Sequence, residues 1–159
     1  MKQKLADVAT PSKRPMDLAL GEAEAAGLSG EVPIGAVVVS ASGEVLARAG
    51  NRTLQLHDPT AHAELIAIRE ACAKLGSERL TGCDLHVTLE PCAMCAAAIS
   101  FARIRRLYFG APDPKGGAVE HGPRFFTQPT CHHAPEIYSG MGEEEAGDML
   151  RDFFRERRG

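Results

Sequence analysis

A predicted strand, helix and strand follow one another between residues 84 and 109, and this order constrains the fold more than any other feature. Residues 84–89 have a short strand pattern, residues 91–101 are alanine-rich and begin with a proline, and residues 103–109 form a second strand pattern that ends at Gly110. A strand, helix and strand in close succession require a crossover connection, which pairs the two strands in parallel. The chain is therefore predicted to have an α/β fold.

The other elements are predicted from hydrophobic period, turn residues and helix caps. The chain begins with a predicted helix over 16–28 and a β-hairpin of strands 34–39 and 44–49. A helix follows that Asp58 caps, Pro59 opens and that ends near Leu75. After the last strand of the strand–helix–strand unit we expect a long loop over 111–135 with one helical turn, a strand over 136–138 and an amphipathic helix over 143–158. The second helix would begin where His62 and Glu64 stand.

The length of 159 residues suits one domain with one hydrophobic core and is too short for two ordinary domains. We expect a loose leader over residues 1–14 and one domain over 15–159. The longest apolar run, 34–39, is far too short to span a bilayer. The first 14 residues contain no apolar stretch of the kind a secretory signal needs, so the expected location is the cytoplasm.

The segment Pro91-Cys92-Ala93-Met94-Cys95 is the most specific motif in the chain. The chain has five cysteines, an odd number, which favours reduced thiols or metal ligands over a set of disulfides. Cys92 and Cys95 stand three apart at the start of a predicted helix, so both sulfurs face one side of its first turn. The positive helix end lowers a thiol pKa from its free value of about 8.5, and zinc binds thiolates. The alternative interpretation is two buried apolar cysteines.

A third metal ligand is expected from His62. One nitrogen and two sulfurs suit zinc and leave its fourth tetrahedral position open to water, as in catalytic sites. A structural zinc would need a fourth protein ligand, for which the chain offers three further candidates: His57, Cys83 and Cys131.

Glu64 distinguishes a catalytic from a structural site. Taken alone, His62 and Glu64 two residues apart also fit a solvated helix start. Zinc lowers the pKa of a bound water from about 9 to near 7, and a neighbouring carboxylate can take its proton and pass it to a ring nitrogen and then to a departing amine. A purely structural zinc site has no use for such a group, so Glu64 is the predicted catalytic residue.

These motifs resemble those of the bacterial tRNA-specific adenosine deaminases of the cytidine deaminase-like superfamily, from about Met16 to Arg158. A His-x-Glu followed by Pro-Cys-x-x-Cys is the signature of zinc nucleobase deaminases. Other matching segments lie outside the metal motif, at 31–36, 50–52, 57–61, 87–90 and 108–117. The segment 120–126 departs from the family pattern.

The resemblance implies a single-domain, three-layer α/β/α fold with a mixed five-stranded sheet and helices on both faces. It also implies one Zn²⁺ per subunit, a homodimer, and a tRNA anticodon stem-loop as substrate, in which the wobble adenosine becomes inosine. Asn51 would hydrogen-bond the target base, and Ala63, Asp113 and Lys115 would bind the substrate. The loop over 113–117 and the arginine-bearing last helix would face the RNA.

Support for RNA from the residues themselves is local, because the net charge is −3. Basic residues gather in two places: Arg151, Arg155, Arg157 and Arg158, and Arg103, Arg105 and Arg106. Arginines at a helix C-terminus also complement the helix dipole without binding RNA, which leaves both interpretations open. Phe153 and Phe154 are predicted to pack in the core.

Two other functions remain open. One is a deaminase of a free base or nucleoside, of the guanine or cytosine type, with the same zinc residues. The other is a non-catalytic, zinc-stabilised RNA-binding module, which would have a closed four-ligand zinc site and would release no ammonia.

Overall fold

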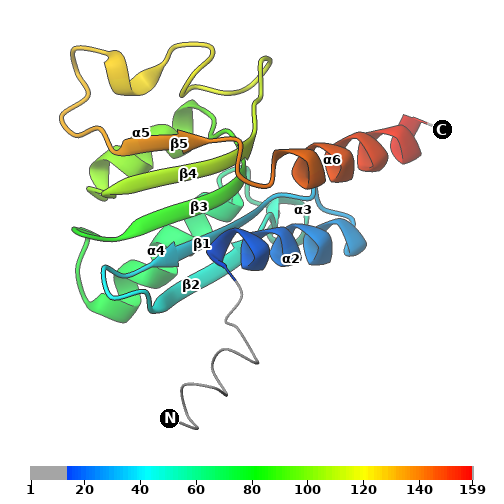
Figure 1. Ribbon diagram of the computed structural model, residues 1–159. Coiled ribbons are helices and arrows are strands. Elements are labelled where there is room, and N and C mark those ends of the chain that lie inside the picture. The colour runs from blue at the N-terminus through cyan, green and yellow to red at the C-terminus, as the bar shows by residue number, and fades with distance from the viewer. Residues whose placement is uncertain (1–13, 159) are drawn as a thin grey trace, which may run out of the picture.

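A mixed five-stranded sheet forms the centre of the computed structural model, which describes residues 14–158 (Figure 1). Its strands are β1 (Gly35–Val39), β2 (Val45–Gly50), β3 (Asp84–Leu89), β4 (Arg106–Ala111) and β5 (Glu136–Ser139), in the spatial order β2-β1-β3-β4-β5. β1 pairs antiparallel with β2 and β3, whereas β3, β4 and β5 run parallel. The predicted hairpin and the predicted parallel pair are both confirmed.

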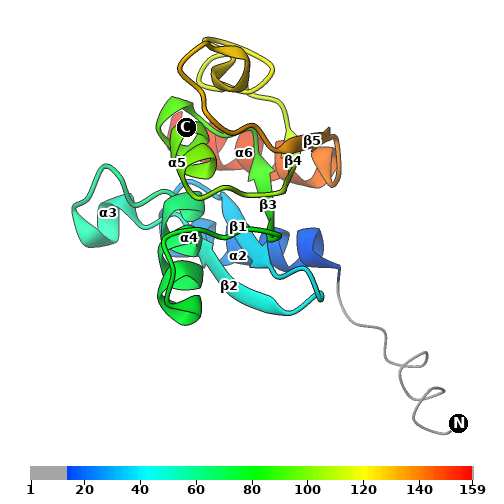
Figure 2. The same cartoon turned by 90° about the vertical axis from the view of Figure 1, so that its left-hand side faces the viewer.

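Helices cover both faces of this sheet, as predicted (Figures 1 and 2). The helices are α2 (Pro15–Leu28), α3 (Thr53–Leu56), α4 (Ala63–Leu75), α5 (Ala93–Phe101), the 3₁₀ turn η1 (Phe125–Thr127) and α6 (Glu143–Arg158). α4 and α5 lie side by side on one face, and α2 and α6 lie on the other (Figures 1 and 2). Within residues 14–158, no helix is both long enough and apolar enough to cross a membrane.

Two apolar clusters hold the layers together. The larger one fills the space between the sheet and helices α4 and α5 and includes Leu85, Phe109 and Ile99, all fully buried. Burying a side chain of this size contributes roughly 1.5–3 kcal/mol. On the other face α2 packs directly on β1, because Gly35 has no side chain: a Cβ there would lie 1.9 Å from the carbonyl oxygen of Ala19. Helices on both faces are thereby fixed to the same sheet.

The start of α4 differs from the prediction in one respect. Asp58 is not its N-cap, because its Oδ1 accepts hydrogen bonds from the backbone N–H and the hydroxyl of Thr60, at 2.8 Å and 2.7 Å. His57 before it has a φ of 50°, which closes the short helix α3. α4 begins instead at Ala63 with His62 at the N-cap position. The expectation that this helix starts at His62 and Glu64 is therefore confirmed, and the capping role of Asp58 was wrong.

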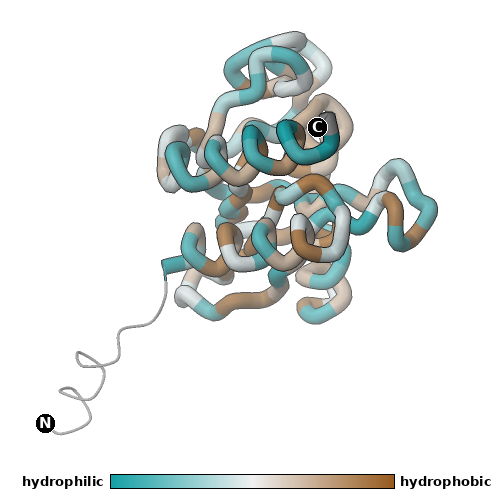
Figure 3. Tube along the Cα trace, turned by 90° about the vertical axis from the view of Figure 1, so that its right-hand side faces the viewer, coloured by the Kyte–Doolittle hydropathy of each residue, from teal (hydrophilic) through white to brown (hydrophobic). Residues whose placement is uncertain are grey.

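Smaller differences occur elsewhere. α5 begins at Ala93, two residues after Pro91, with Cys92 at its N-cap position. The long loop before β5 contains one helical turn, as expected. The last turns of α6 are mainly hydrophilic (Figure 3), and Phe154 is 45% exposed, so its predicted place in the core was wrong. Of the leader predicted for residues 1–14, all but Arg14 lies outside the described residues.

Candidate metal centre

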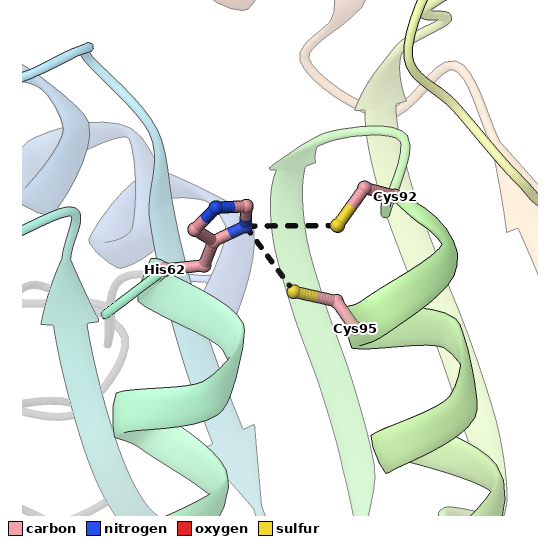
Figure 4. A group of neighbouring side chains, drawn as sticks. All are labelled: His62, Cys92 and Cys95. Atoms are coloured by element: carbon pink, nitrogen blue, oxygen red, sulfur yellow. Dashed lines mark hydrogen bonds between the residues drawn. The ribbon is translucent and has the colours of Figure 1, made fainter. Parts of the chain in front are cut away.

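Two helix N-termini bring the three predicted metal ligands together. His62 precedes the first residue of α4, and Cys92 and Cys95 lie at the start of α5. The ligand atoms of the three residues all lie within 4.8 Å of one another. Nδ1 of His62 is 3.7 Å from Sγ of Cys92 and 3.5 Å from Sγ of Cys95 (Figure 4).

These distances fit a zinc ion. Tetrahedral zinc bonds of about 2.3 Å to sulfur and about 2.0–2.1 Å to nitrogen place the nitrogen and each sulfur about 3.6 Å apart. The observed separations of 3.7 Å and 3.5 Å match this value. The donor set of one imidazole and two thiols is also well suited to zinc.

The candidates for a fourth ligand lie elsewhere in the described chain. Cys83 belongs to the apolar core, and Cys131 contacts Ser100 and the carbonyl oxygen of His133. His57 is exposed in the turn after α3. Within residues 14–158 the group that could hold a metal consists of His62, Cys92 and Cys95. A set of three protein ligands corresponds to the open site of a catalytic zinc rather than to a closed structural one.

The two thiols differ in their tendency to ionise. A hydrogen bond from Cys95, together with one from His62, lowers the pKa of Cys92 to about 4, although burial opposes this. The pKa of Cys95 is raised, because Cys95 keeps the proton that it shares with Cys92 and is itself buried. The contact with Cys92 also raises the pKa of His62. The lowered pKa favours the thiolate form of Cys92, which is the form of cysteine that binds a metal.

Glu64 lies in the first turn of α4, beside this group. Its side chain is 4% exposed, and burial raises its pKa to about 7. A carboxyl group in this position can act on a reacting molecule at the centre without being one of the three ligands.

Asn51 follows β2 and is fixed by α4. Its Oδ1 accepts a hydrogen bond of 2.8 Å from the backbone N–H of Ala63, and its side chain is largely buried. Because the oxygen is committed to Ala63, the amide nitrogen is the group left to donate to a ligand. The side chain of Ala63 is fully buried, so Ala63 acts here through its backbone, by orienting Asn51.

An open pocket of roughly 800 Å³ begins at Asn51. Asp113 and Lys115 line one part of it, and Phe154 and Arg157 of α6 line another. Asp113 also stabilises its own turn, because its Oδ1 accepts hydrogen bonds from the backbone N–H groups of Lys115 and Gly116. The four predicted substrate-binding residues are thus not equivalent: Asn51, Asp113 and Lys115 line the pocket, and Ala63 lies behind it.

Two residues of this region were missed by sequence reasoning. Phe154 was expected in the core, and the position of α6 makes it part of the pocket wall. Glu90 stands in the matching segment 87–90 but was given no role, yet it is 2% exposed and holds the loop that carries Asp113. Burial opposes ionisation of Glu90, but hydrogen bonds from Asp113 and His121 outweigh it and lower the pKa of this carboxyl group.

Comparison with known proteins agrees with this site. Residues 10–111 match the family model of the cytidine and deoxycytidylate deaminase zinc-binding region. The chain is 68% identical over 143 residues to the tRNA-specific adenosine deaminase of Agrobacterium fabrum (strain C58 / ATCC 33970), covering 90% of this chain and 93% of that protein. The enzyme of the same name from Bacillus subtilis (strain 168) is 48% identical over 143 residues, covering 90% of this chain and 88% of that protein.

Solved structures agree as well. One similar structure comes from biochemical and structural studies of A-to-I editing by tRNA:A34 deaminases. It has a TM-score of 0.84 and 68% sequence identity, covering 86% of this chain and 98% of that chain. The structure of guanine deaminase from Bacillus subtilis has a TM-score of 0.62 and 30% sequence identity, covering 91% of this chain and 92% of that chain. The resemblance inferred from the motifs is confirmed, as is zinc as the cofactor. The chain belongs to the cytidine and deoxycytidylate deaminase zinc-binding family.

Proposed function

We propose that this protein is a zinc-dependent hydrolase that converts adenosine to inosine at the wobble position of a tRNA anticodon loop. The observation that carries the proposal is a set of three metal ligands, open at its fourth position, beside the buried carboxyl group of Glu64. The relative at 68% identity is named a tRNA-specific adenosine deaminase, which supports this substrate over others.

The chemistry follows from the residues at the centre. His62, Cys92 and Cys95 would hold one zinc ion per subunit, and bound zinc supplies a Lewis acid that lowers the pKa of water. Hydrolytic deamination of adenine replaces the amino group on C6 by an oxygen atom from water. Glu64 would accept one proton of that water and deliver it to N1 of the ring. It would then take the remaining proton from the hydroxyl group formed on C6 and pass it to the amino group, which leaves as ammonia while C6 becomes a carbonyl. The amide nitrogen of Asn51 would donate a hydrogen bond that orients the base.

The pocket favours a base that is part of an RNA chain. It is open and extends from Asn51 to α6, so a nucleotide bound at the centre could keep its neighbours in the strand. The exposed ring of Phe154 offers a surface on which a neighbouring base can stack. Arg157 lies over the ring of Phe153, 3.8 Å from its centroid, in a position to meet phosphate oxygens. Asp113 and Lys115 line the same pocket and would also contact the RNA.

Substrate choice is the test of this proposal. With an RNA hairpin of the anticodon stem-loop carrying adenosine at the wobble position, we expect inosine as the product. With free guanine, cytosine or cytidine we expect no ammonia. A hairpin with guanosine at that position is the control and should release no ammonia. Ammonia from guanine or cytidine without inosine in the hairpin would instead support the free-base or nucleoside deaminase.

We further propose that the protein is a homodimer that pairs through the side of the molecule bearing α3 and α5. These two helices expose large apolar side chains: Leu54 (67% exposed), Leu56 (46%), Met94 (36%) and Phe101 (73%). Exposed large apolar side chains are typical of protein interfaces, and here two helices of one side of the molecule carry them.

The dimer proposal predicts that Phe101→Glu yields monomers in sedimentation at a concentration where the unchanged protein is dimeric. Burying a charge without a partner opposes association. Leu28→Glu is the matched control, because Leu28 is 86% exposed on α2, which lies on the other face of the sheet. An unchanged protein that sediments as a monomer, or a Phe101→Glu variant that stays dimeric, would contradict this interface.

The remaining proposals concern location and boundaries. Because tRNA is the proposed substrate, we infer that the enzyme works in the cytoplasm. We also propose that residues 15–159 form the deaminase domain and that residues 1–14 precede it as a leader.

A further inference from the structure

Glu90 is a buried carboxylate that lies between β3 and the metal motif. It follows the last residue of β3, precedes Pro91 and is 2% exposed. Its two oxygens accept five hydrogen bonds from the segment 113–121. The donors are the backbone N–H groups of Asp113 (2.9 Å), Val119 (3.1 Å), Glu120 (2.8 Å) and His121 (3.0 Å), and Nδ1 of His121 (2.8 Å). Because an ionised carboxylate only accepts hydrogen bonds, Nδ1 of His121 carries the proton.

The segment folds closely around this carboxylate. A Cβ added at Gly117 would lie 2.5 Å from Cδ of Glu90 and 2.6 Å from the carbonyl oxygen of Asp113, so only glycine fits there. The backbone N–H of Gly117 donates to that same oxygen at 2.8 Å, and the N–H of Ala118 donates to the carbonyl oxygen of Pro91 at 2.9 Å. The contacts with Glu90 and with the backbone next to it thus fix the conformation of the turn over 113–121.

The outer side of the same segment faces the pocket. Asp113, Lys115 and Gly116 line it, together with Phe154, and Asn51 lines the same pocket. The contacts with Glu90 on the inner side and the pocket-lining residues on the outer side belong to one tight turn. A change in the contacts with Glu90 therefore shifts the residues that line the pocket.

We propose that Glu90 is a positioning residue for substrate binding and that His121 completes its anchor, holding Asp113 and Lys115 in place beside Asn51. This inference rests on the proposed function. It also gives a role to His121, which stands in the segment 120–126. The side chain of His121 is 36% exposed, whereas that of Glu90 is fully buried, so His121 can be changed without opening the core.

The test uses His121→Ala and His121→Asn in the full-length zinc enzyme, with KM and kcat measured on the anticodon hairpin. A hydrogen bond to a charged group is stronger than one between neutral groups, and because His121 is partly exposed we expect a moderate effect, about a tenfold rise in KM for His121→Ala. kcat should stay within about twofold, because zinc, Glu64 and Asn51 are untouched. His121→Asn should keep a KM near that of the unchanged enzyme, because the asparagine amide nitrogen can occupy the position of Nδ1.

A second pair of variants tests the carboxylate itself. Glu90→Gln loses the charge and one acceptor oxygen, and it should raise KM by about tenfold or more while one zinc per subunit is retained. Adding His121→Ala to Glu90→Gln should raise KM little further, because both changes remove the same anchor. Glu120→Gln is the matched control: it lies in the same turn, its side chain is exposed, and its KM should not change.

The outcomes separate the two proposals. An unchanged enzyme that forms no inosine in the hairpin contradicts the proposed function, and the positioning role with it. Inosine formation by the unchanged enzyme, combined with a normal KM for both His121→Ala and Glu90→Gln, contradicts the positioning role alone. A fall in kcat at constant KM also contradicts it, as does a His121→Asn enzyme that is as impaired as His121→Ala.

Discussion

Replacing Glu64 with alanine should leave zinc bound and lower the rate of deamination by about 10²–10⁴-fold or more. Glu64 is not one of the three ligands that surround the metal position, so its loss removes no bond to zinc. It is the buried carboxyl group next to them, and its removal takes away the group that carries a proton to the ring and to the amine. The measurements are zinc content per subunit and single-turnover formation of inosine.

Two further variants make the result for Glu64 specific. Glu64→Gln keeps the shape of the side chain but cannot transfer a proton, and it should be as inactive as Glu64→Ala. Glu70→Gln carries the same chemical change on an exposed position of the same helix and should retain full activity. A Glu64→Ala enzyme with zinc and near-normal activity would refute the proposed role of Glu64.

Cys92→Ala should lose both zinc and activity. Changes in groups that merely orient a ligand commonly lower metal affinity by about 10–100-fold, and removal of a ligand should exceed that. Cys92 is also the thiol whose pKa is lowered, so the variant loses the thiol that ionises more readily. Zinc content after dialysis against a chelator and inosine formation are the measurements. Cys72→Ala is the control, since Cys72 is a partly buried cysteine on α4 that packs against the core.

X-ray absorption on the zinc-loaded protein distinguishes the remaining alternative. Two sulfur and one nitrogen ligands from the protein, with an oxygen ligand in the fourth position, are expected for a catalytic centre. Four protein ligands, or full zinc retention by Cys92→Ala, would contradict the proposed centre and favour a non-catalytic, zinc-stabilised module.

Several features could be predicted because they depend on neighbours in the sequence. Parallel pairing of β3 and β4 follows from the short crossover between them, and that crossover is α5 with Cys92 and Cys95 at its start. The spacing of these two cysteines places both sulfurs on one side of a helix turn wherever the helix lies. His62 and Glu64 stand two residues apart at the start of α4, one at its N-cap position and one in its first turn, so their closeness in the sequence places both at the same helix end.

Other predictions failed or were missed because the deciding contacts lie elsewhere. Asp58 has the residue type of a helix cap, but its carboxylate accepts hydrogen bonds from Thr60 instead, and α4 begins later in the chain. Phe154 lies on an amphipathic helix, but the place of α6 against the sheet puts this ring at the pocket instead of in the core. Glu90 meets donors that lie 23 to 31 residues further along the chain, so no local pattern could show its role.

The sequence by itself determined the chemistry of this protein: three zinc ligands, one acid, and the helix starts on which they stand. These follow from side-chain type and from spacings within single helical turns. The tertiary structure alone decided which groups lie around the metal centre and its pocket. These are the amide of Asn51 oriented by Ala63, the part of the pocket wall formed by α6, and the turn held by Glu90 and His121. The reason is physical: each depends on a contact between segments brought together only by packing against the sheet.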